Sequence, residues 1–481
     1  MKIEKILIGW AERDITPDRP VNLYGQFHPR ISEYVKDPIT VTALAIGTER
    51  DYVVMVSCDI CSIKKEVCKI CREKIKKALP EIDTLKVVFN ATHTHTAPTT
   101  VEGDYPPEPE GVMTPPEYAE FFTDRVTEAV VEAWNKREKT GVSWAYGHAV
   151  VAHNRRAVYF DDISKRPGYQ SKVGLIVDGT SKMYGNTNDV NFSHIEGYTD
   201  HSLETLFTWD KNGNLTGVVI NLACPSQETE GTSYVSADFW HEIRTEVRKR
   251  CGEGLYVLPQ CSSAGDQSPH RLLYGKAEDR MLQLRGTDMR QEIGRRVGVI
   301  IEELIPYAKK DIRTDLPFKH IAETIPLKKR LVTEDELRMV KEEMAEIENR
   351  QPANHREELT KFKGLLRCRS VVKKYEEQKN QPFSEEEIHI VRLGDIAFTT
   401  NRFELFLDYG LRIKARSPFI QTFIVQLAGE GPYLSTERAV AGRGYSAVIY
   451  DNDIGPEGGQ QLVEETVKIL KEIYEEKENV Y

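Results

Sequence analysis

The chain has 481 residues, of which 40% are hydrophobic and 29% charged, and its formal net charge at pH 7 is -10. These values are typical of a globular protein with a large core, and the negative charge argues against nucleic acid or an anionic membrane as a partner. No apolar run approaches the roughly 18 residues that a membrane helix needs. We therefore expect a soluble protein that acts on a small molecule.

The first half of the chain alternates between predicted strands and predicted helices. An apolar stretch around Gly9, without the cleavage site of a signal peptide, predicts a first strand and a cytoplasmic location. Helices are predicted over residues 63–78 and 117–134, the second preceded by a capping box of Thr114 and Glu117. Further strands are predicted over residues 39–47, 52–58, 85–92, 142–153, 215–224 and 255–261. This alternation predicts an α/β fold with a mixed β-sheet core and flanking helices.

Two Cys-x-x-Cys pairs, Cys58 with Cys61 and Cys68 with Cys71, resemble the knuckles of a zinc site. Only six residues separate the two pairs, whereas zinc ribbons usually place about 15–20 residues between them. The second pair also falls on a helix rich in Lys and Glu, so the pairs need not converge. We therefore expect buried free thiols in a reducing cytoplasm.

The segment Ala91-Thr92-His93-Thr94-His95-Thr96 follows an apolar run at residues 87–89. That run shows no alternation, which is expected for a strand covered on both faces. In an extended backbone His93 and His95 would share one face about 7 Å apart. Two imidazoles at the end of a buried strand are typical of a metal or proton-transfer site. The alternative is a pair of solvated histidines, and we favour the functional pair.

Residues 333–380 are densely charged and predict a helical hairpin inserted in a single domain over residues 1–481. Thr333 and Glu336 form a capping box, followed by an apolar stripe at helical spacing. The hairpin is a lid or wall over an active site, a surface projection, or a coiled-coil-like contact with a second copy in a homo-oligomer. Strands are predicted again over 388–400, 419–428 and 447–450, before a closing helix over 461–475. Sheet segments on both sides of the hairpin favour one domain.

Polar clusters follow several of the predicted strands, where open α/β sheets place their binding sites. Each has an unremarkable alternative: a helix cap for Glu404, a turn for Asp266, or core packing for Tyr445. The clusters are His93 with His95, Asn154-Arg155-Arg156, Cys224 with Asp238, Asp266 with Ser268, and Glu404 with Tyr445.

The order of these motifs resembles the neutral/alkaline (non-lysosomal) ceramidase family. The resemblance implies an α/β catalytic domain that binds one zinc ion, and ceramidases of the family hydrolyse the amide of ceramide. It covers the catalytic domain alone, without the immunoglobulin-like domain that follows in those ceramidases. The motifs are Gly9-Trp10-Ala11, Asp14-Ile15-Thr16-Pro17, Thr92-His93-Thr94-His95, Asn154-Arg155, Ser236-Ala237-Asp238, Gly265-Asp266-x-Ser268-Pro269 and Gly444-Tyr445.

Position by position, the resemblance implies a role for each motif residue. His93, Glu404 and Tyr445 fall on zinc ligands of the family, and Tyr445 is also a catalytic candidate. His95 falls on the histidine that contacts substrate and Ser268 on a serine with a catalytic role, and both are catalytic candidates here. We expect the remaining motif residues to bind substrate: Asn154, Arg155, Arg156, Asp238 and Asp266.

One zinc ligand of the family has no counterpart here. The family has a second zinc histidine before the Ser-Ala-Asp motif, where this chain has Leu222-Ala223-Cys224-Pro225. Because thiolate is a good zinc ligand, Cys224 is the predicted fourth ligand. The alternatives are that His201 or His241 reaches the site from elsewhere, or that no metal binds.

These observations favour a zinc-dependent, amidohydrolase-type enzyme that cleaves an amide or related carboxylic bond of a soluble small molecule with metal-activated water. A second hypothesis is an acid/base isomerase, epimerase or lyase acting on a polyol or sugar-like substrate, with His95, Asp238 and Asp266 moving protons. A third is a ligand-binding relative without catalytic activity. The identity of the substrate stays open.

Overall fold

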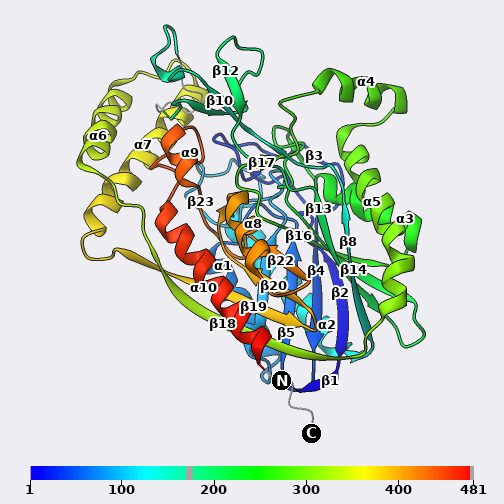
Figure 1. Ribbon diagram of the computed structural model, residues 1–481. Coiled ribbons are helices and arrows are strands. Elements are labelled where there is room, and N and C mark those ends of the chain that lie inside the picture. Colours follow the sequence, from blue (N-terminus) through cyan, green and yellow to red (C-terminus); the bar gives the residue numbers. More distant parts are fainter. Residues whose placement is uncertain (1, 170–176, 477–481) are drawn as a thin grey trace.

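The computed structural model describes residues 2–169 and 177–476, and its main strands form three β-sheets (Figure 1). In sheet order, the first contains β6 (Val87–Ala91), β5 (Tyr52–Cys58), β4 (Thr40–Gly47), β2 (Leu7–Asp14) and β7 (Glu138–Lys139). The second contains β16 (Tyr256–Cys261), β14 (Leu215–Leu222), β13 (Ser202–Trp209) and β8 (Gly141–His148). The third contains β1 (Ile3–Lys5), β18 (Asp315–Lys328), β19 (Phe383–Leu393), β20 (Ile396–Thr400) and β22 (Gln421–Val425).

Each of the three sheets is mixed, with one parallel pair of strands among antiparallel neighbours. The parallel pairs are β5 with β6, β14 with β16, and β20 with β22. Backbone hydrogen bonds join the sheets near the ends of these pairs, for example from the Gln426 amide to the Cys261 carbonyl (3.0 Å). The carboxyl ends of six parallel strands therefore meet in one region of the molecule.

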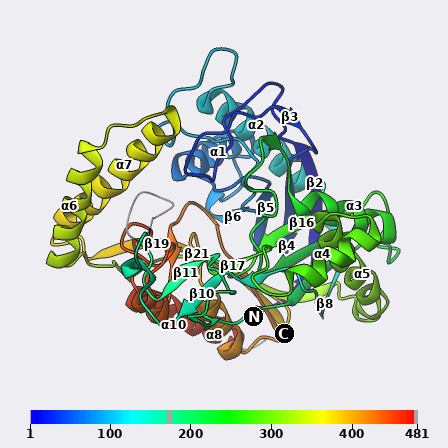
Figure 2. The same ribbon diagram turned by 90° about the horizontal axis from the view of Figure 1, so that it is seen from above.

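The three sheets share one apolar core, to which each contributes one face. Trp10, Leu206 and Phe423, one from each sheet, belong to the same buried cluster. The opposite faces are covered by helix pairs, which surround the sheets when the molecule is seen from above (Figure 2). The pairs are α1 (Lys65–Ala78) with α2 (Pro115–Asn135), α3 (Phe239–Cys251) with α5 (Met289–Ala308), and α8 (Leu407–Arg416) with α10 (Pro456–Glu475).

The predicted α/β fold with mixed sheets and flanking helices is confirmed. Strand β5 has the predicted bounds, and the capping box of Thr114 and Glu117 is present at the start of α2. Two of the segments that differ from expectation lie in the last third of the chain. The predicted strand over 388–400 is a hairpin of β19 and β20 that turns at Gly394, a glycine with φ of +61°. Residues 447–450 form turns, because Val448 and Ile449 pack against helices instead of joining a sheet.

Helices α6 (Glu334–Asn349) and α7 (His355–Glu377) occupy the range of the predicted hairpin insertion. Thr333 and Glu336 form the capping box of α6, and the Asn354 side chain caps α7. The two helices pack on each other and on the loop at Val448 and Ile449. They connect β18 to β19 and lie at the edge of the molecule in both views (Figures 1 and 2). The remaining helices are α4 (Gly275–Arg285) and the short α9 (Glu437–Gly442).

A buried histidine on β18 predicts a loss of stability in acid. His320 is 6% exposed, and its Nε2 lies 3.1 Å from Nδ1 of His389 on β19. Burial, with a smaller contribution from His389, lowers the pKa of His320 to about 4. The unfolded chain binds this proton near pH 6.5 and the folded chain does not, so stability is lost as the pH falls from 6.5 to 4. We expect His320 to reduce the free energy of unfolding by about 2 kcal/mol between pH 7.5 and pH 5.

Urea unfolding of the wild type and of His320→Gln at the two pH values measures this loss. The variant should lose less stability than the wild type on acidification, whereas His194→Gln, at an exposed histidine, should behave as the wild type. Equal losses in wild type and His320→Gln would exclude His320 as the source.

No helix among residues 2–169 and 177–476 combines the length and the apolarity required to cross a membrane.

Candidate active site

A cavity of about 280 Å³ lies where the parallel strands end. His93 and His95 follow β6, Cys61 follows β5, and Glu404 follows β20. A volume of this size is at the lower end of the range for small-molecule sites, about 300–1,000 Å³. The cavity is lined by Tyr24, Gly25, Gln26, Phe27, Cys61, Ser62, His93, His95, Tyr105, Lys363, Leu366, Arg367, Glu404, Leu427, Glu430, Gly431, Tyr433 and Tyr445.

The two histidines lie closer together than an extended strand would place them. Strand β6 ends at Ala91, and His93 adopts a left-handed backbone with φ of +66°. This conformation is unfavourable for a residue with a side chain and is concentrated at functional sites. The turn brings the imidazole rings of His93 and His95 to 4.9 Å between centroids, in place of the expected 7 Å spacing along one face.

His93 is held with its Nε2 atom toward Glu404. Its Nδ1 atom lies 2.7 Å from the Cys61 carbonyl oxygen, to which it donates, and its Nε2 atom lies 3.3 Å from the Glu404 carboxylate. Glu404 lies opposite Tyr433 in the short parallel pair of β21 (Glu404–Leu405) and β23 (Tyr433–Leu434). Burial opposes the charge on His93, but Cys61 and Glu404 raise its pKa well above the usual value. Burial likewise opposes the charge on Glu404, and His93 lowers the pKa of that carboxyl.

His95 is oriented by a second carboxylate. Its Nδ1 atom lies 3.4 Å from the Glu230 carboxylate, and its Nε2 atom lies 2.9 Å from the Gln227 amide nitrogen and 3.4 Å from Nε2 of His93. An imidazole that accepts from the Gln227 amide at Nε2 carries its proton on Nδ1 and donates it to Glu230. Glu230 also lies 3.4 Å from Nε2 of His270. Burial opposes ionisation of Glu230, but His270 and His95 hold its pKa well below the usual range.

Cys61 is the thiol nearest the histidines. Its Sγ atom lies 3.7 Å from Nδ1 of His93, and donor atoms of Cys61, His93 and His95 all lie within 4.8 Å of one another. Burial raises the pKa of a thiol, but the nearby histidines more than offset this and lower that of Cys61 to about 6. All eight cysteines are free. The site therefore brings the Cys61 sulfur, two imidazole rings and the Glu404 carboxyl group together around His93.

The donors at this end of the cavity fit a tetrahedral zinc ion. Two ligand atoms that bind one such ion at about 2.0–2.1 Å lie about 3.3 Å apart. The distance from Nε2 of His93 to Glu404 is 3.3 Å, and that to Nε2 of His95 is 3.4 Å. The contact of His93 Nδ1 with the Cys61 carbonyl is of the kind that a metal-binding histidine normally makes with its other ring nitrogen.

The structure brings His93, His95, Glu404 and Tyr445 to one cavity, and the other predicted site residues lie outside its lining. Cys224 is buried in the apolar cluster of the second sheet, where its Sγ atom lies 3.5 Å from the Pro225 carbonyl oxygen. The described group of metal-donor residues around His93 contains Cys61, and neither Cys224, His201 nor His241.

Two predicted substrate-binding residues, Arg155 and Arg156, contact residues of the cavity lining from outside it. Arg155 donates to the Tyr433 hydroxyl (3.1 Å) and lies 3.5 Å from the Gln227 side-chain oxygen, so it joins two neighbours of the histidine pair. Arg156 is fully buried, pairs with Glu196 (2.9 Å) and donates to the Tyr445 carbonyl (3.0 Å). Both arginines hold the loops that carry site residues.

The remaining motif residues are committed to local structure. Asn154 donates to Asp266 (2.8 Å), whose other oxygen accepts from the Leu407 amide at the start of α8 (2.9 Å). Ser268 lies 2.9 Å from the Tyr184 hydroxyl. Asp238 caps α3 and accepts two hydrogen bonds of 2.7 Å from Thr229, which holds the loop that carries Gln227 and Glu230.

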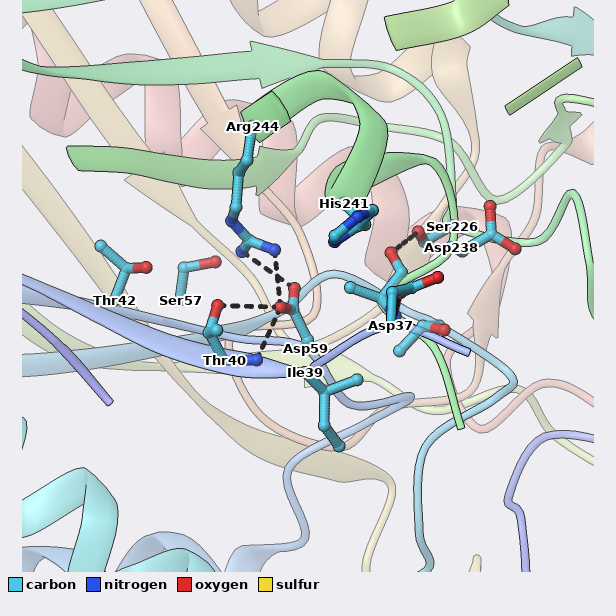
Figure 3. Close-up of polar contacts among 12 residues, drawn as sticks. Asp37, Ile39, Thr40, Thr42, Ser57, Asp59, Ser226, Asp238, His241 and Arg244 are labelled. Atoms are coloured by element: carbon cyan, nitrogen blue, oxygen red, sulfur yellow. Dashed lines mark hydrogen bonds and ion pairs between the residues drawn. The ribbon is translucent and has the colours of Figure 1, made fainter. Parts of the chain in front are cut away.

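A buried ion pair fixes the loop that carries Cys61. Asp59 follows β5 and accepts from both terminal nitrogens of Arg244 on α3, at 2.7 and 3.1 Å (Figure 3). The backbone and hydroxyl of Thr40 donate to the same carboxylate, at 2.9 and 3.1 Å. The next residue, Ile60, accepts the His93 amide (3.0 Å), so this ion pair also supports the strained backbone at His93.

Sequence reasoning missed four contributors to the site: Cys61, Gln227, Glu230 and Tyr433. A signal for Cys61 was present, because it belongs to a Cys-x-x-Cys pair. The spacing between the two cysteine pairs was considered, but not a site that combines Cys61 with the histidines. Glu230 and Gln227 lie just after the expected Cys224 position. Nothing in the local pattern marks Tyr433, which reaches the site through its pairing with Glu404.

Comparison with known proteins agrees with this architecture. The chain matches no model of a protein family and no curated protein sequence. Among solved structures, it is similar to neutral ceramidase from Pseudomonas aeruginosa, with a TM-score of 0.67 and 15% identity over 99% of this chain and 76% of that chain. A ceramidase complexed with C2 gives a TM-score of 0.67 and 14% identity, with the same coverage of both chains. The resemblance indicated by the motifs is thus confirmed for the fold, which is that of a neutral ceramidase.

The contact between His95 and Glu230 makes a testable prediction. Glu230→Gln preserves the shape of the side chain but removes the charge that orients His95. Because a misoriented acid/base histidine loses part of its contribution of about 10²–10⁴-fold, we expect kcat/KM to fall about 10–100-fold, with the acid limb of the pH profile moved to lower pH. Glu253→Gln, at an exposed glutamate, should change neither quantity. An unaltered pH profile in Glu230→Gln would separate Glu230 from the function of His95.

Proposed function

We propose that the protein is a zinc-dependent hydrolase that cleaves an amide or related carboxylic bond of a small molecule. The observation that carries the proposal is that His93 and Glu404 lie at the distance of two zinc ligands, with Cys61 and His95 beside them at one end of the cavity. The similarity of the fold to a neutral ceramidase supports the same reaction class.

His93 and Glu404 would hold the ion, with the thiolate of Cys61 and the hydroxyl of Tyr445 as the further donors in the same cavity. This set gives Cys61 the role that sequence reasoning assigned to Cys224. A zinc ion supplies Lewis acidity, which polarises a carbonyl group and makes hydroxide available near neutral pH.

The side chains around the donors would handle the protons. His95 faces the same point as His93, and its contact with Glu230 fixes the orientation and tautomer of its imidazole. In hydrolysis the hydroxyl of water bonds to the acyl carbon, the C–N bond breaks, and the amine leaves with a proton. His95 is placed to take the proton from water and return it to the amine. The Tyr433 hydroxyl accepts from Arg155 and is hydrogen-bonded to Glu404, so it positions that carboxylate.

Two measurements on purified protein test the proposal: metal content, and the mass of products formed from small amides. We expect close to one zinc ion per chain and products that together exceed the substrate by the mass of one water. A product of unchanged mass would instead support the isomerase hypothesis, and one lighter by an eliminated group would support a lyase. Binding without turnover would support the non-catalytic hypothesis.

The acid/base hypothesis receives less support from the geometry. It required His95, Asp238 and Asp266 to act on one substrate, but the two aspartates cap helices and do not line the described cavity. Only His95, with Glu230, is placed for that role. We therefore propose hydrolysis alone.

A further inference from the structure

Helix α7 contributes two cations to the wall of the cavity that holds the candidate metal ligands. Lys363 and Arg367 are four residues apart, so they occupy one face of the helix, and both line the cavity. His93 and Glu404 line the same space. The cavity is therefore basic on its helical wall and carries the candidate reacting groups on the side formed by the strand ends.

Lys363 retains unused hydrogen-bonding capacity. Its ammonium group donates to the Asp104 backbone carbonyl and lies 4.4 Å from the centre of the Tyr105 ring. Within the described parts of the chain, no carboxylate lies within ion-pair distance of it. An ammonium group has three donors, so two remain available to a ligand.

Arg367 is held rigidly but is not fully satisfied. One terminal nitrogen donates to Asp451, and the guanidinium lies 5.4, 5.9 and 5.5 Å from the ring centres of Phe27, Tyr445 and Tyr450. Its other terminal nitrogen, Nη1, is buried and has no hydrogen-bond partner among the residues that the structure describes. A buried donor without an acceptor is costly, and a ligand that supplied the acceptor would gain affinity.

We infer that Lys363 and Arg367 form a subsite for a carboxylate group, and that the substrate is a small amide which carries a carboxylate. This inference rests on the proposed function, which assigns the cleaved bond to the side of His93 and Glu404. If each non-hydrogen atom takes the ~30 Å³ of a liquid water molecule, the cavity of 280 Å³ encloses about nine of them. A short N-acyl amino acid has this size and this charge.

Isothermal titration of the zinc-supplemented protein with N-acetylglycine and with the neutral N-acetylglycinamide tests the subsite. We expect the wild type to bind the carboxylate at least about tenfold more tightly, because hydrogen bonds to charged groups are worth that much. Arg367→Lys keeps a cation for Asp451 but removes the second guanidinium donor, and Lys363→Gln removes a charge. Each should reduce the preference several-fold, and the double variant should abolish it.

Lys373→Gln is the matched control, because Lys373 is an exposed lysine on α7 that pairs with Glu377 and lies outside the described cavity lining. It should leave the preference unchanged. Equal binding of the two ligands, binding of neither, or a full preference in the double variant overturns the carboxylate subsite. Metal content and hydrolysis of neutral amides are measured on the same preparation. Zinc and turnover without a carboxylate preference overturn this inference alone, whereas a preference without zinc or turnover overturns the proposed function alone.

Discussion

Under the proposed function, His93→Ala is expected to abolish zinc binding and to lower kcat/KM for hydrolysis about a thousandfold. The variant loses the His93 nitrogen that lies 3.3 Å from Glu404. Of this pair of candidate ligands only Glu404 remains. A metal acting as a Lewis acid contributes several kcal/mol to transition-state stabilisation, which corresponds to a loss of this size. The zinc content of the dialysed protein, measured by elemental analysis, should fall from about one ion per chain to a small fraction of one.

His93→Gln provides a second variant with a polar side chain of similar length, which limits the cost of exposing Glu404 to an empty, buried space. Unfolding curves of both variants would show that they fold. His194→Ala, at an exposed histidine remote from the described cavity lining, should keep both zinc and activity. If His93→Ala retains stoichiometric zinc, the metal site lies elsewhere.

Arg244→Met is expected to lower the free energy of unfolding by about 3–5 kcal/mol, the usual cost of leaving one member of a buried ion pair without its partner. Asp59 is fully buried and accepts from both terminal nitrogens of Arg244. Thr40 alone cannot compensate the charge that would remain. Urea unfolding at pH 7 measures the loss.

Two variants separate the charge from the shape of the side chain. Asp59→Asn combined with Arg244→Met leaves a neutral amide that still accepts from Thr40, so it should recover most of the stability. Arg250→Met removes an arginine from the same helix, but its ion pairs with Glu246 and Glu302 are partly exposed to solvent, so the cost should stay within about 1 kcal/mol. Similar losses in Arg244→Met and Arg250→Met would exclude the proposed origin of the effect.

Local patterns were sufficient where each element carries its own signal. The apolar run of β5 and the capping box of α2 lie within a few residues, and both were predicted correctly. Strand β18 was not predicted, because it contains Pro317 and Pro326, and proline normally disfavours a central strand. The apolar residues at 447–450 suggested a strand, but their partners are the distant helices α6 and α7.

In the candidate site, too, residues that belong to local motifs were predicted, whereas a residue placed by strand pairing was missed. From the order of the motifs, His93, Glu404 and Tyr445 were predicted to share one site, and all three line the cavity. Cys61 was missed because its proximity to His93 follows from the parallel pairing of β5 with β6, which brings the loops after both strands side by side. Pairing between strands some 30 residues apart leaves no trace in the spacing of cysteines along the chain.

The helical wall of the cavity and its candidate reacting groups come from different parts of the chain. The hairpin of α6 and α7 supplies the wall, and the loops after the strands supply His93, His95 and Glu404. The hairpin leaves the third sheet at Lys328 and returns at Phe383, and these two residues are paired partners in the ladder of β18 and β19. Its length and sequence can therefore change without altering the register of the sheet or moving His93, His95 and Glu404. Substrate preference could thus diverge among descendants of this fold, or be redesigned by exchanging hairpins, while the reacting groups are inherited unchanged.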